Sequence, residues 1–202
     1  MMIKRVPFLA TVAIGLSALS GGTAAAQSPD PGVASAVLHD VDGAPVGTVT
    51  WTQGDRLVTV DVSVAGLPAG FHGFHVHSVG ECVAPFTSAG GHLNPDQVGH
   101  PGHAADMPVL LVNADGTGTA SFVTDRYAVA DLVGVAVIVH ANPDNYANIP
   151  ERYEAPGSSA SPAASAEPVM IAGPDAATLN TGDAGPRIAC GVIESGPAAS
   201  AQ

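Results

Sequence analysis

Short stretches in which apolar and polar residues alternate dominate the chain between residues 33 and 193. The clearest one runs from Arg56 to Val64, where valines at every second position alternate with Thr59, Asp61 and Ser63. Successive side chains of a β-strand point to opposite faces, so this pattern predicts a strand with one buried face in an antiparallel sheet. Further β-rich stretches, separated by turn residues, are Val33–His39, Val46–Thr52, Phe71–Ser78, Met107–Asn113, Thr117–Thr124, Val133–His140 and Arg187–Ile193.

Eight short strands with no competing helical period predict an all-β domain, an eight-stranded Greek-key β-barrel or sandwich. Two spans between strands, 79–106 and 141–186, are long for connections in a compact domain, so we expect them to carry function. Inside the second span, residues 155–168 read APGSSASPAASAEP, a low-complexity composition that predicts a solvated insertion. The composition of 195–202 predicts a flexible tail.

The first 26 residues predict a signal peptide rather than part of the fold. Lys4 and Arg5 precede an apolar stretch from Val6 to about Leu19, and an Ala-Ala-Ala cleavage signal ends at Ala26. The apolar stretch is too short for a membrane span, although an uncleaved anchor is the alternative. We therefore expect a mature domain of residues 27–202 that is exported to the periplasm, the cell envelope or the medium.

Charge narrows the set of partners. The chain has 18 acidic and 6 basic side chains; cleavage removes two basic residues and leaves a net charge of −14 with no lysine. Nucleic-acid binding needs clustered Lys and Arg, and anionic lipid attracts the same residues. The composition thus argues against a nucleic-acid partner and against stable membrane association.

Export also determines how the two cysteines are interpreted. Outside the cytoplasm, Cys82 and Cys190 most simply form one disulfide. In the chain-entropy model a loop of this length contributes roughly 4–5 kcal/mol to stability. The alternative is a pair of unpaired thiols that act as metal ligands.

Six of the eight histidines fall between residues 72 and 103, a density that points to metal binding. On a strand, His75 and His77 share one face and can share one ion, whereas His72 points to the opposite face. For His72 we predict a buried, hydrogen-bonded core histidine.

A second group of ligand types lies in the first long span. His100, His103 and Asp106 fall within seven residues and, with His92 as a fourth ligand, suit a tetrahedral zinc ion. The alternative is a polar loop with incidental histidines. His140 ends an apolar strand, and Asp144 follows four residues later, where its carboxylate can accept the far N–H of a ligand imidazole.

Five motifs resemble the copper/zinc superoxide dismutase family. They are FHGFHVHSVGEC, AGGHLNP, the HxxD of His103–Asp106, VIVHANPD and GDAGPRIACGVI, and in this order they cover nearly all of 33–193. The resemblance implies a Greek-key β-barrel with copper bound by His75, His77, His92 and His140. It implies zinc bound by His92, His100, His103 and Asp106, with His92 bridging the two ions.

The same resemblance implies further roles. Cys82 and Cys190 would form an intrasubunit disulfide, Asp144 would link copper and zinc ligands, Arg187 would receive the anion and Thr181 would lie across the channel mouth. The implied reaction converts superoxide to dioxygen and hydrogen peroxide through alternating Cu(II) and Cu(I), and a homodimer is compatible with the family. The short His100–His103 spacing and the long span before Arg187 depart from the family pattern.

Other functions are weighed against this one. A dismutase-like protein that sequesters copper with little turnover is the main alternative, but it does not need an anion-docking Arg187. A structural β domain stapled by metals is disfavoured by an open copper site. A zinc hydrolase is disfavoured because no general base stands beside an open zinc position.

Overall fold

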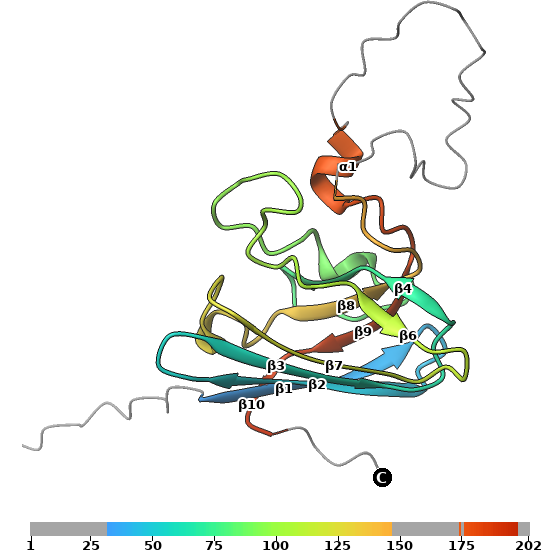
Figure 1. Ribbon diagram of the computed structural model, residues 1–202, viewed down its shortest axis with the longest axis horizontal. Coiled ribbons are helices and arrows are strands. Elements are labelled where there is room, and N and C mark those ends of the chain that lie inside the picture. Colours follow the sequence, from blue (N-terminus) through green and yellow to red (C-terminus); the bar gives the residue numbers. More distant parts are fainter. Residues whose placement is uncertain (1–31, 147–173, 175, 198–202) are drawn as a thin grey trace, which may run out of the picture.

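A computed structural model describes residues 32–146, 174 and 176–197, and it has an all-β architecture (Figure 1). The main sheet is antiparallel, curled and eight-stranded, in the order β5-β8-β9-β1-β2-β3-β7, with β10 paired to β1. A two-stranded sheet joins β4 and β6. The strands are β1 Val33–Asp40, β2 Pro45–Gln53, β3 Val58–Val64, β4 Gly70–His72, β5 Phe74–His77, β6 Leu110–Val112, β7 Gly118–Thr124, β8 Ala136–His140, β9 Arg187–Val192 and β10 Glu194–Ser195.

The core follows the alternation seen in the sequence. In β3 the four valines at even positions are buried, whereas Asp61 and Ser63 are exposed. β3 pairs with β2 on one side and β7 on the other, so its valines join Trp51 and Phe122 in one apolar cluster. Burial of such surface is the main favourable term for this fold.

The prediction of one continuous strand from Phe71 to Ser78 is wrong. Residues 71–78 form two strands, β4 and β5, which break at Gly73 and join different sheets. Gly73 donates its backbone N–H to Asn142 and accepts one from His140. A Cβ at this position would lie 2.6 Å from both the Ala184 Cβ and the Asp144 Oδ1, so a side chain has no room. The close approach of three chain segments interrupts the strand.

His72 is a core histidine, as predicted. It is 2% exposed, and its two ring nitrogens lie 2.7 Å from the His140 carbonyl oxygen and 2.8 Å from that of Pro68. These contacts attach the β4 strand to the end of β8, which is where the candidate site begins.

The connections contain structure that the strand pattern does not predict. A short helix, α1 (Ala176–Thr181), ends the second long span, and the 3-10 helices are η1 (Thr87–Ala89) and η2 (Val129–Asp131). The expected tail begins later than predicted, because Ser195 pairs with Ala34 of β1 and the Gly196 N–H donates to Val33. The predicted signal peptide, the 155–168 insertion and residues 198–202 lie outside the described residues. No helix in the described ranges is long and apolar enough to cross a membrane.

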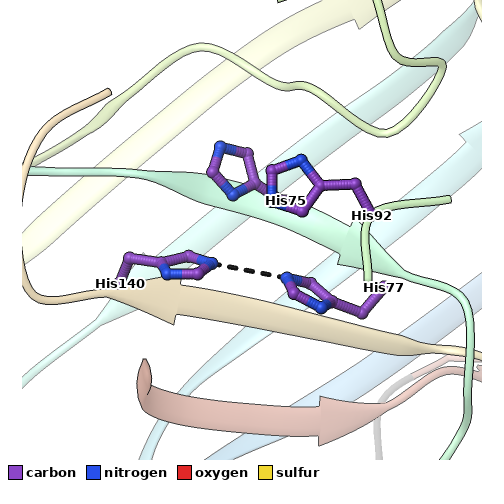
Figure 2. A group of neighbouring side chains, drawn as sticks. All are labelled: His75, His77, His92 and His140. Atoms are coloured by element: carbon purple, nitrogen blue, oxygen red, sulfur yellow. Dashed lines mark hydrogen bonds between the residues drawn. The ribbon is translucent and has the colours of Figure 1, made fainter. Parts of the chain in front are cut away.

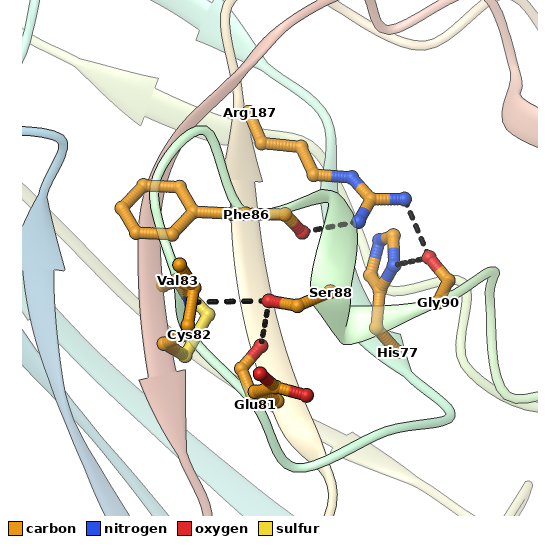
Figure 3. The surroundings of a disulfide bond; sticks show 9 residues. His77, Glu81, Cys82, Val83, Phe86, Ser88, Gly90 and Arg187 are labelled. Carbon is orange, nitrogen blue, oxygen red and sulfur yellow. Dashed lines mark hydrogen bonds between the residues drawn. A yellow bond between two sulfur atoms is a disulfide. The ribbon is translucent and has the colours of Figure 1, made fainter.

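The disulfide between Cys82 and Cys190 is present, so the alternative of two free thiols is wrong. Cys190 lies in β9, and Cys82 lies in the loop that follows β5. The bond therefore ties the first long span to the centre of the sheet (Figure 3).

We predict that removing the disulfide costs up to about 4–5 kcal/mol of unfolding free energy, because the unfolded chain regains the entropy of a 108-residue loop. Denaturant unfolding of the metal-free double variant Cys82→Ser/Cys190→Ser measures this loss against the oxidised wild type. Unfolding free energies within about 1 kcal/mol of each other would contradict the prediction.

Candidate metal centre

Strands β5 and β8 supply three of the histidines. His75 and His77 lie two residues apart in β5 and pair in register with Ile138 and Ala136 of β8. β8 ends at His140, whose Nε2 lies 3.3 Å from the Nε2 of His77. Figure 2 shows these rings meeting between the two strands.

The 79–106 span runs back along the other edge of β5 and brings in the remaining ligand types. Leu93 donates its N–H to Val76, and Val76 donates to Ala105. Isolated bridges set His77 opposite His92, and His75 opposite Asp106. An edge that would otherwise expose unpaired backbone groups thus becomes the seam along which distant residues converge.

The first cluster consists of four buried imidazoles that offer ligand atoms within 4.8 Å of one another: His75, His77, His92 and His140. The rings of His75 and His92 are closest, with centroids 4.1 Å apart (Figure 2). The structure therefore brings together all four residues predicted to bind copper.

In two of these rings the outer nitrogen, which faces away from the cluster, forms a hydrogen bond with a backbone carbonyl. The inner nitrogen, which faces into the cluster, keeps its lone pair free. His77 Nδ1 lies 2.9 Å from the carbonyl oxygen of Gly90, and His140 Nδ1 lies 3.0 Å from that of Gly185. A carbonyl can only accept, so each Nδ1 carries the hydrogen and each Nε2 keeps its lone pair. His75 Nδ1 and His92 Nε2 are buried without a hydrogen-bond partner among the described residues. Unpaired imidazole nitrogens at one point fit a copper ion.

The environment keeps these rings neutral at ordinary pH. Burial, followed by the neighbouring His92, lowers the pKa of His77 to about 2, and burial lowers that of His140 to about 4. Burial also lowers the pKa of His75 and of His92. A neutral imidazole is the form that binds a metal, so His75, His77 and His140 can each take an ion through one ring nitrogen without losing a proton.

The second cluster surrounds Asp106. Its carboxylate oxygens lie 2.9 Å from His92 Nδ1, 3.0 Å from His100 Nδ1 and 3.2 Å from His103 Nδ1. Burial raises the pKa of Asp106, but hydrogen bonds from His100 and His92 outweigh it and hold the pKa well below its usual range. An ionised carboxylate among three imidazoles fits the ligand set of zinc.

His103, unlike the other predicted zinc ligands, lies outside the set of four donors that are mutually close. The four donors that lie within 4.8 Å of one another are those of His75, His92, His100 and Asp106. His103 Nδ1 nevertheless lies 3.0 Å from His92 Nδ1. All four residues predicted to bind zinc therefore meet at one place, and the role of His103 stays a prediction.

Asp144 contacts a ligand imidazole, as its place after His140 suggested. It accepts from His75 Nε2 at 3.0 Å, which leaves Nδ1 of the same ring facing the first cluster. Burial raises the pKa of Asp144 to about 7. The carboxylate holds the orientation of His75 between the two clusters.

Two residues contact His100 in ways that the sequence pattern does not predict. The ring of Tyr146 stacks on His100, with centroids 5.9 Å apart and planes 9° apart. Gly182, just after α1, lies so close that a Cβ would be 2.5 Å from His100 Nε2. Both residues come from the second long span, so the contact depends on how the two loops fold together.

Arg187 lies at the start of β9, opposite His140 in the strand register. Its guanidinium donates to the carbonyl oxygens of Phe86 and Gly90, and Gly90 also accepts from His77 (Figure 3). The disulfide loop thus holds a cation next to the first cluster. Thr181 lies exposed at the end of α1, where its hydroxyl donates to Ala177.

Comparisons with known proteins agree with this geometry. A family model described as copper/zinc superoxide dismutase (SODC) matches residues 46–193. The chain is 39% identical to the Cu-Zn superoxide dismutase of Mycolicibacterium paratuberculosis, over 88% of this chain and 80% of that one. It is 38% identical to that of Mycobacterium tuberculosis, over 84% and 73%. The crystal structure of the clock protein EA4 has a TM-score of 0.63 at 29% identity, covering 84% of this chain and 98% of that one.

We predict that chelating the metals lowers the melting temperature of the protein. At free metal about 1,000 times the dissociation constant, one bound ion adds about 4 kcal/mol, which corresponds to roughly 8–16 °C for a domain of this size. Calorimetry of the chelated and the reloaded protein measures the shift. Superimposable melting curves would show that the donors bind no metal.

His140→Ala should lose copper while it retains zinc, because His140 belongs to the first cluster alone. The matched control is His39→Ala, since His39 is exposed and lies in β1. Metal analysis after dialysis compares the two variants. Equal copper content in both would contradict the assignment of His140.

Proposed function

This chain belongs to the copper/zinc superoxide dismutase family, an oxidoreductase family, and we propose that it is an exported dismutase built on the two clusters. Two superoxide anions and two protons give one dioxygen and one hydrogen peroxide. The observation that carries the proposal is the convergence of four neutral, buried imidazoles beside a fixed cation, Arg187.

The residues divide between two ions. Copper would be held by the inner nitrogens of His75, His77, His92 and His140, and it supplies the one-electron couple that the reaction needs. Zinc would be held by His92, His100, His103 and Asp106. His92 contributes to both clusters, with Nε2 toward the first and Nδ1 beside Asp106.

The protein groups around the two ions orient the ligand rings and exclude water from them. Asp144 and the Gly90 and Gly185 carbonyls select the ring nitrogen that faces the ion, because each binds the other nitrogen of a ligand imidazole. His75 and His77 lie on the face of β5 opposite Phe74 and Val76, which belong to the core, and all four rings of the first cluster are buried, so little water reaches them. His92 is the group we assign to carry a proton toward the product, since its ring is shared between the clusters.

Arg187 would dock the substrate anion. Its guanidinium keeps its charge at any working pH and is only partly buried. The mature chain is strongly acidic, but at physiological ionic strength distant charges are screened over about 8 Å. A local cation beside the ions can therefore govern the approach of superoxide, and we assign Thr181 to the mouth of the same channel.

The alternative function, copper sequestration with little turnover, would use the same donors. It would use Arg187 only to hold the backbone of Phe86 and Gly90, and it gives no role to a positive charge beside the first cluster. A monomer and a homodimer are both compatible with this site. Sedimentation of the metal-loaded protein separates the two.

We predict that Arg187→Gln lowers the rate of superoxide consumption about 10- to 100-fold at unchanged copper content, because a fixed positive charge is lost where the anion binds. Arg187→Lys should retain part of the rate. Pulse radiolysis measures the rate, and Arg56→Gln, an exposed arginine between β2 and β3, is the control.

Three results would count against the enzyme. One is an Arg187→Gln rate within twofold of the wild type. Another is a wild-type protein that binds copper tightly and consumes no superoxide, which would establish the sequestering function instead. A wild-type chain that takes up no copper would remove the basis of both.

Export has its own test. We predict that the protein recovered from the envelope or the medium begins at Gln27, because cleavage follows the Ala-Ala-Ala signal. N-terminal sequencing of the recovered protein checks this. A full-length chain that stays with the cytosolic fraction would contradict it.

A further inference from the structure

Arg126, which follows strand β7, makes contacts that no function described above uses. Its Nη1 donates to three backbone carbonyl oxygens, at 3.1 Å from Pro101, 3.0 Å from His103 and 3.1 Å from Asp106. The three acceptors lie within six residues of one another, in the segment that carries His100, His103 and Asp106. One cation thus gathers the backbone of the segment that supplies most of the second cluster.

The segment has few other means of support from side chains. Apart from the ligand residues and Pro101, residues 99–105 are Gly99, Gly102, Ala104 and Ala105, which carry at most a methyl group. Two internal turns fold it, since Gly102 donates to Gly99 and Asp106 donates to His103. These turns set its local shape, but they do not determine where it lies relative to the barrel.

Other backbone hydrogen bonds attach the two ends of the segment. His100 donates its N–H to Leu179 of α1, and Ala105, which is fully buried, accepts from Val76 of β5 and donates to Leu93. The carbonyls of Pro101, His103 and Asp106 face the other way, toward Arg126. Because Nη1 has two hydrogens for three acceptors, one hydrogen is shared, an arrangement that holds all three carbonyls around one point.

Arg126 itself is anchored to the rigid part of the molecule. Its N–H donates to Thr124 Oγ1 in β7, and the next residue, Tyr127, is buried in the core. Val129 is fully buried, and its N–H donates to the side chain of Gln53. The guanidinium therefore connects a fixed point on the barrel to the segment 100–106.

We propose that Arg126 is a positioning residue for the zinc ligands, which holds the backbone of 100–106 so that His100, His103 and Asp106 point at one ion. This inference rests on the proposed assignment of the second cluster to zinc. Loss of the guanidinium removes no ligand side chain, but it frees the backbone that positions these ligands. The affinity for zinc therefore falls, while copper binding is retained. Removal of groups that orient metal ligands typically lowers metal affinity 10- to 100-fold.

Zinc competition titrations on the full mature chain, with copper already bound, test the proposal. We compare the wild type with Arg126→Gln, Arg126→Lys and the control Arg56→Gln. Arg126→Gln should bind zinc 10- to 100-fold more weakly, and Arg56→Gln should match the wild type. Arg126→Lys should recover most of the affinity, because an ammonium offers three N–H groups to three carbonyls.

Cobalt(II) in place of zinc gives a readout that general stability does not move. The visible absorption bands of cobalt report ligand geometry. In Arg126→Gln they should weaken or shift, whereas the copper spectrum and the copper content stay as in the wild type.

Either of two results would overturn the proposal: zinc affinity in Arg126→Gln within threefold of the wild type, or an equal loss of zinc and copper. A wild-type chain that binds copper and no zinc would overturn it as well. Wild-type protein that binds both ions but consumes no superoxide would refute the proposed function and leave this inference standing.

Discussion

The two edges of strand β5 are the constraint on which the site depends. One edge pairs with β8, and the other is covered by the backbone of residues 91–106 rather than by a further strand. Every donor in the two clusters lies on β5, at the end of β8 or in this covering loop. If the loop left the edge, β5 would expose unpaired backbone groups, and His92 and Asp106 would separate from His75 and His77.

Burial of many imidazoles together is costly unless each ring is satisfied. Here the outer nitrogens of the ligand rings bind carbonyls or carboxylates, and low pKa values keep the rings uncharged. Inner nitrogens such as His75 Nδ1 and His92 Nε2 have no protein partner in the described part of the chain, so their desolvation destabilises the fold. A bound metal ion offsets this desolvation cost, which couples the function of this family to its stability.

Cations in this acidic chain have specialised positions. The described arginines that make side-chain contacts, Arg126 and Arg187, both donate to backbone carbonyls of the first long span. Arg187 holds the disulfide loop beside the first cluster, and Arg126 holds the segment with the zinc ligand types. The chain has one lysine, Lys4, which lies in the predicted signal peptide, so these two guanidinium groups are the cations beside the two halves of the candidate site.

The sequence alone determined the all-β class, most strands and the ligand types, because alternation and clustered histidines are local features that survive without tertiary information. The His75–His77 pair and the burial of His72 could be predicted in this way, whereas the disulfide was predicted from the expected export of a chain with two cysteines and from the family resemblance. Only the tertiary structure decided the break at Gly73, the helix α1, the stacking of Tyr146 on His100 and the hydrogen bonds from Arg126 to the segment 100–106. These depend on contacts between segments far apart in the chain, where packing and backbone hydrogen bonding override local preference.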